Sequence, residues 1–154
     1  MNIHLLYTFL FSISPFGEGR VGIPYGILND INPALALSVG LAANLLVYPL
    51  LMLLINTFNA RLWKYRPYKI QSIKLVRRAQ KGAGASIQKY GFWGLMIFVM
   101  IPLPFTGAYM GTIAAYIFKI RKREAFLAIS LGVIVACTII TLSTHFGKMG
   151  VQAL

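Results

Sequence analysis

The chain has 154 residues, of which 58% are hydrophobic and 12% are charged, about half the charged share of an ordinary soluble domain. The net charge is +12, and most Lys and Arg residues gather in two stretches, nine in residues 61–89 and four in residues 119–123. Basic residues that flank apolar runs are typical of the cytoplasmic side of a membrane protein, and they lack the folded aromatic surface of a nucleic-acid-binding protein. The composition therefore excludes a soluble nucleic-acid binder and predicts a single multi-pass domain, residues 1–154, in the cell membrane.

The first apolar region, residues 2–28, is interrupted in its middle. Residues 2–14 lack the basic start and the cleavage site of a signal peptide, so we expect them to be retained. A helix of this length reaches about 20 Å, which is too short for a hydrocarbon core of about 30 Å. Residues 15–24 are rich in Pro and Gly, which remove a backbone donor or permit unusual backbone conformations. The helix is therefore expected to break there, before apolar sequence resumes.

Two later segments are long enough to cross a bilayer without a break. Residues 33–58 and 125–146 contain no Lys, Arg, Asp or Glu. As helices they would extend about 39 Å and about 33 Å. We expect both to be transmembrane helices. Residues 60–89 form a basic connector between the two halves of the chain, either as a helix on anionic lipid or as a solvated segment.

The second broken region, residues 91–118, is interrupted by Pro102-Leu103-Pro104-Phe105-Thr106-Gly107. It is either a kinked spanning helix or a re-entrant hairpin that enters and leaves on one side. A spanning helix would place residues 61–89 and 119–123 on opposite faces, against the positive-inside tendency. The charge distribution therefore favours the hairpin, with both basic stretches in the cytoplasm.

The order of these segments repeats: a broken region and a spanning helix, the connector, then another broken region and spanning helix. If the first broken region is also a hairpin, it must enter from outside, because residues 33–58 end on the cytoplasmic side. The two hairpins would then form an inverted repeat, which many transporters use to build a site near the bilayer midplane. The predicted fold is all-α, with two opposed re-entrant hairpins and two transmembrane helices. Residues shared by the two breaks are expected to shape their tips: Pro15, Gly19, Gly22, Pro24, Pro102, Pro104, Gly107 and Gly111.

Both breaks resemble motifs of the small multidrug export protein family. The first is Pro-x-x-Glu-x-Arg-x-Gly-Ile-Pro-x-Gly in residues 15–26, and the second is Pro-x-Pro-Phe-Thr-Gly-x-x-x-Gly in residues 102–111. The resemblance extends over nearly the whole chain in order and spacing. That family is related to the DedA-like superfamily, so the resemblance implies two re-entrant hairpins that face each other. The wider group includes transporters of lipid-linked carriers and lipid scramblases, which implies a role in moving a lipid or a small molecule.

The break in residues 15–24 holds Glu18 and Arg20, the only Asp, Glu, Lys or Arg inside an apolar segment. A charge at the bilayer centre costs about 2.5–3.5 kcal/mol on insertion scales, so such residues usually serve function. The alternative is that Glu18 and Arg20 pair with each other or with backbone and only brace the tip. The amides that begin each returning half-helix are partially positive and, with Arg20, would favour an anionic group, while Glu18 would bind a proton or a cation. Thr106 either offers its hydroxyl to a substrate or caps the half-helix behind it.

Two polar residues of the spanning helices receive structural interpretations. Asn44 is expected to form an interhelical hydrogen bond rather than to contact a substrate. Cys137, the single cysteine, is expected to be a small packing residue, and it leaves no disulfide framework or metal cluster. We therefore predict no metal and no cofactor.

The sequence offers no catalytic residues for an enzyme of the membrane. Its three acidic residues, Glu18, Asp30 and Glu124, lie on separate segments and do not form a set of metal ligands for phosphotransfer to lipid. We predict a secondary carrier, with a coupling proton as one option, for an amphipathic or anionic small molecule or a lipid carrier. An energy-independent lipid scramblase and a purely structural membrane protein are the alternatives. Membrane lipids are the expected surroundings, and a homo-oligomer is expected unless the tips cover each other.

Overall fold

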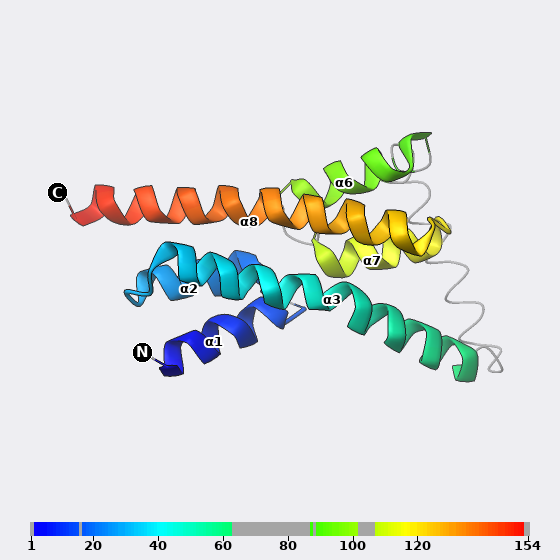
Figure 1. Cartoon of the computed structure of the whole chain (residues 1–154), viewed down its shortest axis with the longest axis horizontal. Coiled ribbons are helices and arrows are strands. Elements are labelled where there is room, and N and C mark those ends of the chain that lie inside the picture. The colour runs from blue at the N-terminus through cyan, green and yellow to red at the C-terminus, as the bar shows by residue number, and fades with distance from the viewer. Residues whose placement is uncertain (1, 16, 63–86, 88, 102–106, 153–154) are drawn as a thin grey trace.

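The computed structural model describes residues 2–15, 17–62, 87, 89–101 and 107–152 (Figure 1). In these residues the only regular secondary structure is helix, which confirms the predicted all-α class. The bounds are α1 (Asn2–Ile13), α2 (Glu18–Leu28), α3 (Pro33–Leu62), α6 (Phe92–Met100), α7 (Ala108–Ile117) and α8 (Lys122–Gln152). Most of the basic connector lies outside the described residues, as do Pro102, Pro104 and Thr106.

The two longest helices, α3 and α8, contain the segments predicted to span a membrane. Residues 33–57 and 122–151 are long and apolar enough to cross a bilayer. Helix α3 begins well because Pro33 occupies its first position and Asn32 Oδ1 accepts a hydrogen bond from the Ala34 amide at 2.9 Å. The two helices run in opposite directions (Figure 1), and the Tyr48 hydroxyl of α3 donates to the Lys122 carbonyl at the start of α8 at 3.0 Å. They form the frame against which the shorter helices pack.

Helices α1 and α2 form the first helix pair, folded back on itself. The chain turns between Ile13 and Glu18, so that His4 near the start of α1 lies 3.2 Å, Nδ1 to Oη, from Tyr25 near the end of α2. The pair is close because glycines of α2 face small side chains of α1. A Cβ at Gly22 would overlap the Ser12 hydroxyl, and one at Gly26 would lie 2.8 Å from the Thr8 hydroxyl. The Gly22/Gly26 spacing therefore allows α1 and α2 to pack closely.

Helices α6 and α7 form the second helix pair. The helix ends at Met100 and resumes at Ala108, within the Pro- and Gly-rich region that the sequence analysis identified as a break. Figure 1 shows α6 running toward the centre of the molecule and α7 running back toward the end at which α8 begins. Gly111 of α7 packs against Val99 of α6, and a Cβ there would lie 2.5 Å from a Val99 methyl. The end of α6 and the start of α7 lie toward the centre of the molecule, as do the end of α1 and the start of α2 (Figure 1).

The core lies between the short helices and the frame, while large apolar side chains cover the outside. Ile23, Leu95, Val99 and Ile129 are all nearly inaccessible. A soluble protein rarely exposes large contiguous apolar patches, whereas such a surface suits contact with lipid. The exposed apolar residues of the frame include Leu46, Leu50, Leu53, Leu54, Leu127, Leu131, Ile134 and Leu142.

Candidate functional site

Glu18 begins α2, and its side chain reaches the start of α7. Its Oε1 accepts a hydrogen bond from the Tyr109 amide at 3.1 Å, and the Ala108 amide also interacts with this carboxylate. The first amides of a helix have no partner within the helix and carry partial positive charge, so they favour an anion. Glu18 itself is therefore the anion held at the N-terminus of α7.

Space and backbone conformation at this contact are both unusual. A Cβ at Gly107 would overlap the Glu18 carboxylate, so the carboxylate fits only because residue 107 has no side chain. Glu18 has φ +51°, in the left-handed region that non-glycine residues rarely adopt. Such a conformation costs on the order of 1–3 kcal/mol and persists where surrounding contacts compensate for it. The hydrogen bonds to α7 are contacts of this kind.

Arg20 binds the other helix of the second pair. Its Nη2 donates to the Ile101 carbonyl at 3.3 Å, directly after the end of α6. The last carbonyls of a helix carry partial negative charge. Glu18 thus faces the partially positive start of α7, and Arg20 faces the partially negative end of α6. These hydrogen bonds to backbone join the two pairs, and a purely structural role in bracing the tip would use contacts of the same kind.

Asn44 of α3 joins the two helices of the first pair at their break. In the amide orientation that satisfies both groups, Oδ1 accepts from the Gly19 amide at 2.8 Å and Nδ2 donates to the Ser12 carbonyl at 3.3 Å. Asn44 thus binds one group at the end of α1 and one at the start of α2. It forms interhelical hydrogen bonds, as the sequence suggested, and they lie beside the charged residues.

These side chains surround a small space, which we call the tip cavity. Its volume is about 10 Å³, room for about one water molecule. Three helices supply its polar lining. Glu18 and Arg20 come from α2, Asn44 from α3 and Cys137 from α8. The apolar or small lining residues are Val99, Gly107, Val133, Ala136 and Ile140. The space as it stands in the structure is therefore too small for a larger ligand.

A further hydrogen bond fastens the breaks together. The Tyr109 hydroxyl donates to the Ile13 carbonyl at 2.5 Å, and Ile13 is the last residue of α1. Its backbone amide meanwhile binds Glu18. Tyr109 thus contacts both helices of the first pair, and nothing in the sequence distinguished it from the other tyrosines.

The residues predicted for the site fall into three groups. Glu18, Arg20 and Gly107 line the tip cavity, and Gly19 donates to the adjacent Asn44. Gly22 and Gly111 contact neighbouring helices away from the charges, while Pro15 lies in the turn and Pro24 within α2. Thr106, Pro102 and Pro104 lie outside the described residues, so their predicted roles stay predictions. Cys137 is buried, as expected of a packing residue, but it also lines the cavity.

Comparison with known proteins gives one family match. A family model described as "Putative small multi-drug export protein" matches residues 18–139, from Glu18 of the candidate site into the middle of α8. No curated protein and no solved structure matches the chain. The matched region includes every described residue of the tip cavity except Ile140.

Proposed function

The chain belongs to the small multi-drug export protein family, and from that premise we propose that it is a secondary transporter whose site lies at the tip cavity. Its substrate is an amphipathic or anionic small molecule or a lipid carrier, and its coupling ion is a proton. The observation that carries the proposal is the Glu18 carboxylate on the Tyr109 amide, with Arg20 and Asn44 beside it at one cavity. Charged residues within apolar helical segments are costly and usually mark a transport pathway.

The proposed topology has α3 and α8 as spanning helices and the two short pairs as re-entrant hairpins of an inverted repeat. Each short helix has 9–12 residues, or about 14–18 Å of length, so none of the four crosses a bilayer alone. Residues 119–123, at the start of α8, lie on the proposed cytoplasmic side, and the turn between α2 and α3 lies on the opposite side (Figure 1). This arrangement would place both breaks, and the tip cavity, near the bilayer midplane.

Glu18 would act as the proton carrier. A carboxylate binds the amides of α7 through its charge, so protonation would weaken that bond and loosen the two helix pairs. The vacated amides and Arg20 would then present a positive site, open to an anionic group of the substrate. When Glu18 loses its proton again, its carboxylate would compete with that group for the same amides. This competition would couple substrate release to proton release.

Proteoliposomes that contain the full chain test the proposal. Movement of amphipathic anions and of labelled lipids should accelerate under an imposed pH gradient, and Glu18→Gln should abolish that dependence. Glu124→Gln, which removes a half-exposed acidic group at the start of α8, is the matched control and should retain the dependence on the pH gradient. Energy-independent lipid movement in both directions would replace the carrier with a scramblase, and no movement of any solute or lipid would leave a structural role.

A further inference from the structure

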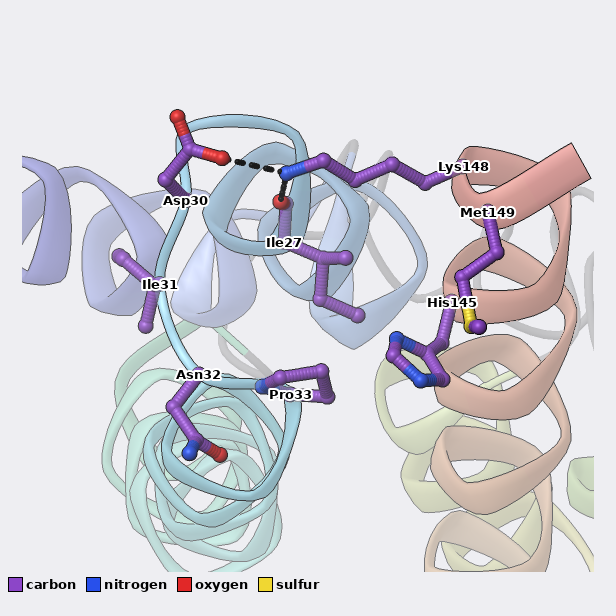
Figure 2. Close-up of a pocket in the computed structure, with 8 residues that line it drawn as sticks. All are labelled: Ile27, Asp30, Ile31, Asn32, Pro33, His145, Lys148 and Met149. Atoms are coloured by element: carbon purple, nitrogen blue, oxygen red, sulfur yellow. Dashed lines mark hydrogen bonds and ion pairs between the residues drawn. The ribbon is translucent and has the colours of Figure 1, made fainter. Parts of the chain in front are cut away.

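A second pocket lies at the opposite end of α2 from Glu18. Its volume is about 250 Å³, and it opens between the turn that joins α2 to α3 and the last turns of α8 (Figure 2). The turn contributes Asp30 and Asn32 among others, and α8 contributes His145, Lys148 and Met149. The family resemblance and the tip cavity do not account for this pocket, which we call the turn pocket.

Lys148 dominates the electrostatics of the turn pocket. Its Nζ lies 2.7 Å from Asp30 Oδ1 and 2.8 Å from the Ile27 carbonyl, so these acceptors take two of its three N–H groups. The Lys148 side chain is only 20% exposed, whereas that of Asp30 is 88% exposed. The Lys148 ammonium is thus part of the pocket wall, while the Asp30 carboxylate lies at the edge of the pocket and is exposed to solvent. Because water screens the exposed Asp30 carboxylate, this ion pair is weak, and another anion can share Lys148 or replace Asp30.

Two further features make the pocket favourable to an anion. His145 lies one turn before Lys148 on α8, and its ring projects from α8 toward Pro33 (Figure 2). Pro33 begins α3, so the partially positive end of that helix lies at the pocket. The titratable side chains that line the pocket are therefore Lys148 and His145 from α8 and Asp30 from the turn.

The surroundings indicate that this anion is attached to an apolar chain. The apolar part of the pocket wall consists of Ile27, Ile31 and Met149. Leu28, the next residue after Ile27, is 62% exposed. The pocket also lies where α8 and α3 reach one end of the frame, the level at which spanning helices meet lipid headgroups. Lys side chains near the ends of spanning helices commonly extend to this interface.

We propose that the turn pocket binds the phosphate group of a membrane phospholipid, with Lys148 and His145 as donors and Asp30 as a competing carboxylate. This site is separate from the proposed transport site and does not depend on it. Bound lipid would link the end of α2 to α8, and so would restrain the helix that begins with Glu18.

The proposal predicts effects of opposite sign for the two partners of the ion pair. The assay measures the thermal unfolding midpoint of the full chain in detergent as dioctanoyl phosphatidylglycerol is added, because a ligand of the folded state raises that midpoint. Lys148→Met should weaken the lipid's apparent affinity on the order of tenfold, and Lys148→Arg should restore it. Asp30→Asn should strengthen it, because the competing charge is gone. Lys122→Met, at the exposed opposite end of α8, is the matched control and should leave it unchanged.

Two further probes distinguish the ligand chemistry. Dioctanoylglycerol, which lacks the phosphate, should raise the midpoint much less than the phospholipid. Inorganic phosphate should also be much weaker, and equal potency would replace the lipid with a free anion. Weaker binding in Asp30→Asn, or an equal loss in Lys122→Met, would overturn the site. If Lys148→Met does not fold, Asp30→Asn and His145→Gln carry the test, with His145→Gln expected to weaken binding.

Discussion

The carboxylate of Glu18 and the backbone amide of Tyr109 are 91 residues apart in the chain and 3.1 Å apart in the structure. This hydrogen bond joins the start of α2 to the start of α7 and so unites the two helix pairs at their breaks. The Glu18 carboxylate is thus an anion of the protein itself at the N-terminus of α7, which would otherwise attract an anion from outside the protein. An anionic substrate at this position must therefore compete with Glu18.

Gly107→Ala tests whether this contact depends on the missing side chain. The added Cβ would overlap the Glu18 carboxylate, so the pairs should separate or shift, with a cost of about 1–3 kcal/mol in unfolding free energy. The φ of Gly107 is 179°, which any residue adopts, so backbone strain does not contribute. Gly147→Ala, with nothing within 4 Å of its added Cβ, should be neutral or stabilise α8 by up to about 1 kcal/mol. Denaturant titration in detergent measures both, and equal values would contradict the contact.

The double variant Glu18→Gln with Arg20→Gln separates function from stability. Removing both charges together avoids an uncompensated buried charge, so the variant should fold. It should nevertheless lose transport, since neither a proton carrier nor a cation remains at the tip cavity. Size-exclusion profiles and proteoliposome flux provide the two measurements. Unchanged flux in the folded variant would leave these residues with a purely structural role.

Asn44→Leu tests the junction of α1 and α2. Leucine has a similar size but leaves the Ser12 carbonyl and the Gly19 amide without their partner, at about 1–3 kcal/mol for each buried group. We expect a clear fall in the thermal midpoint. Asn56→Leu makes the same change at an exposed position of α3 and should have little effect. Equal midpoints for the two variants would show that the hydrogen bonds of Asn44 contribute nothing.

Cysteine labelling tests the proposed topology. On a Cys137→Ala background, single cysteines at Leu75 and Lys122 should react with a membrane-impermeant reagent only from the cytoplasmic side. A cysteine at Asp30 should react only from outside. Labelling of positions 75 and 122 from opposite sides would replace the second re-entrant hairpin with a spanning segment.

The ion pair of Asp30 and Lys148 predicts a pH dependence of stability. The hydrogen bond from Lys148, followed by its positive charge, holds the pKa of the Asp30 carboxyl below its ordinary value. A carboxyl with a lowered pKa stabilises the fold above its unfolded value of about 3.9, and this contribution disappears as pH falls through the folded value. Wild type should therefore have a slightly higher thermal midpoint than Asp30→Asn near pH 7, and the difference should shrink toward about pH 2. A difference that grows on acidification would contradict this assignment.

Much of the helix pattern could be predicted from the sequence. The uninterrupted apolar runs correspond to α3 and α8, and Pro- and Gly-rich segments mark the ends of α1 and α6. These features depend on local chemistry, because backbone hydrogen bonding and hydropathy act within a few residues. The same reasoning identified Glu18 and Arg20, since a charge in an apolar segment is conspicuous wherever it folds.

Only the tertiary structure decided what those charges bind. Sequence could not show that Glu18 meets the amides of α7 while Arg20 meets the Ile101 carbonyl, because these partners are backbone groups that lie more than 80 residues further along the chain. Nor could the sequence show that Asn44 binds the Ser12 carbonyl and the Gly19 amide at the break of the first pair, or that Tyr109 contacts both α1 and α2. The physical reason is that partial charges at helix ends act over a few ångströms, so their partners are set by how the helix pairs pack against α3 and α8.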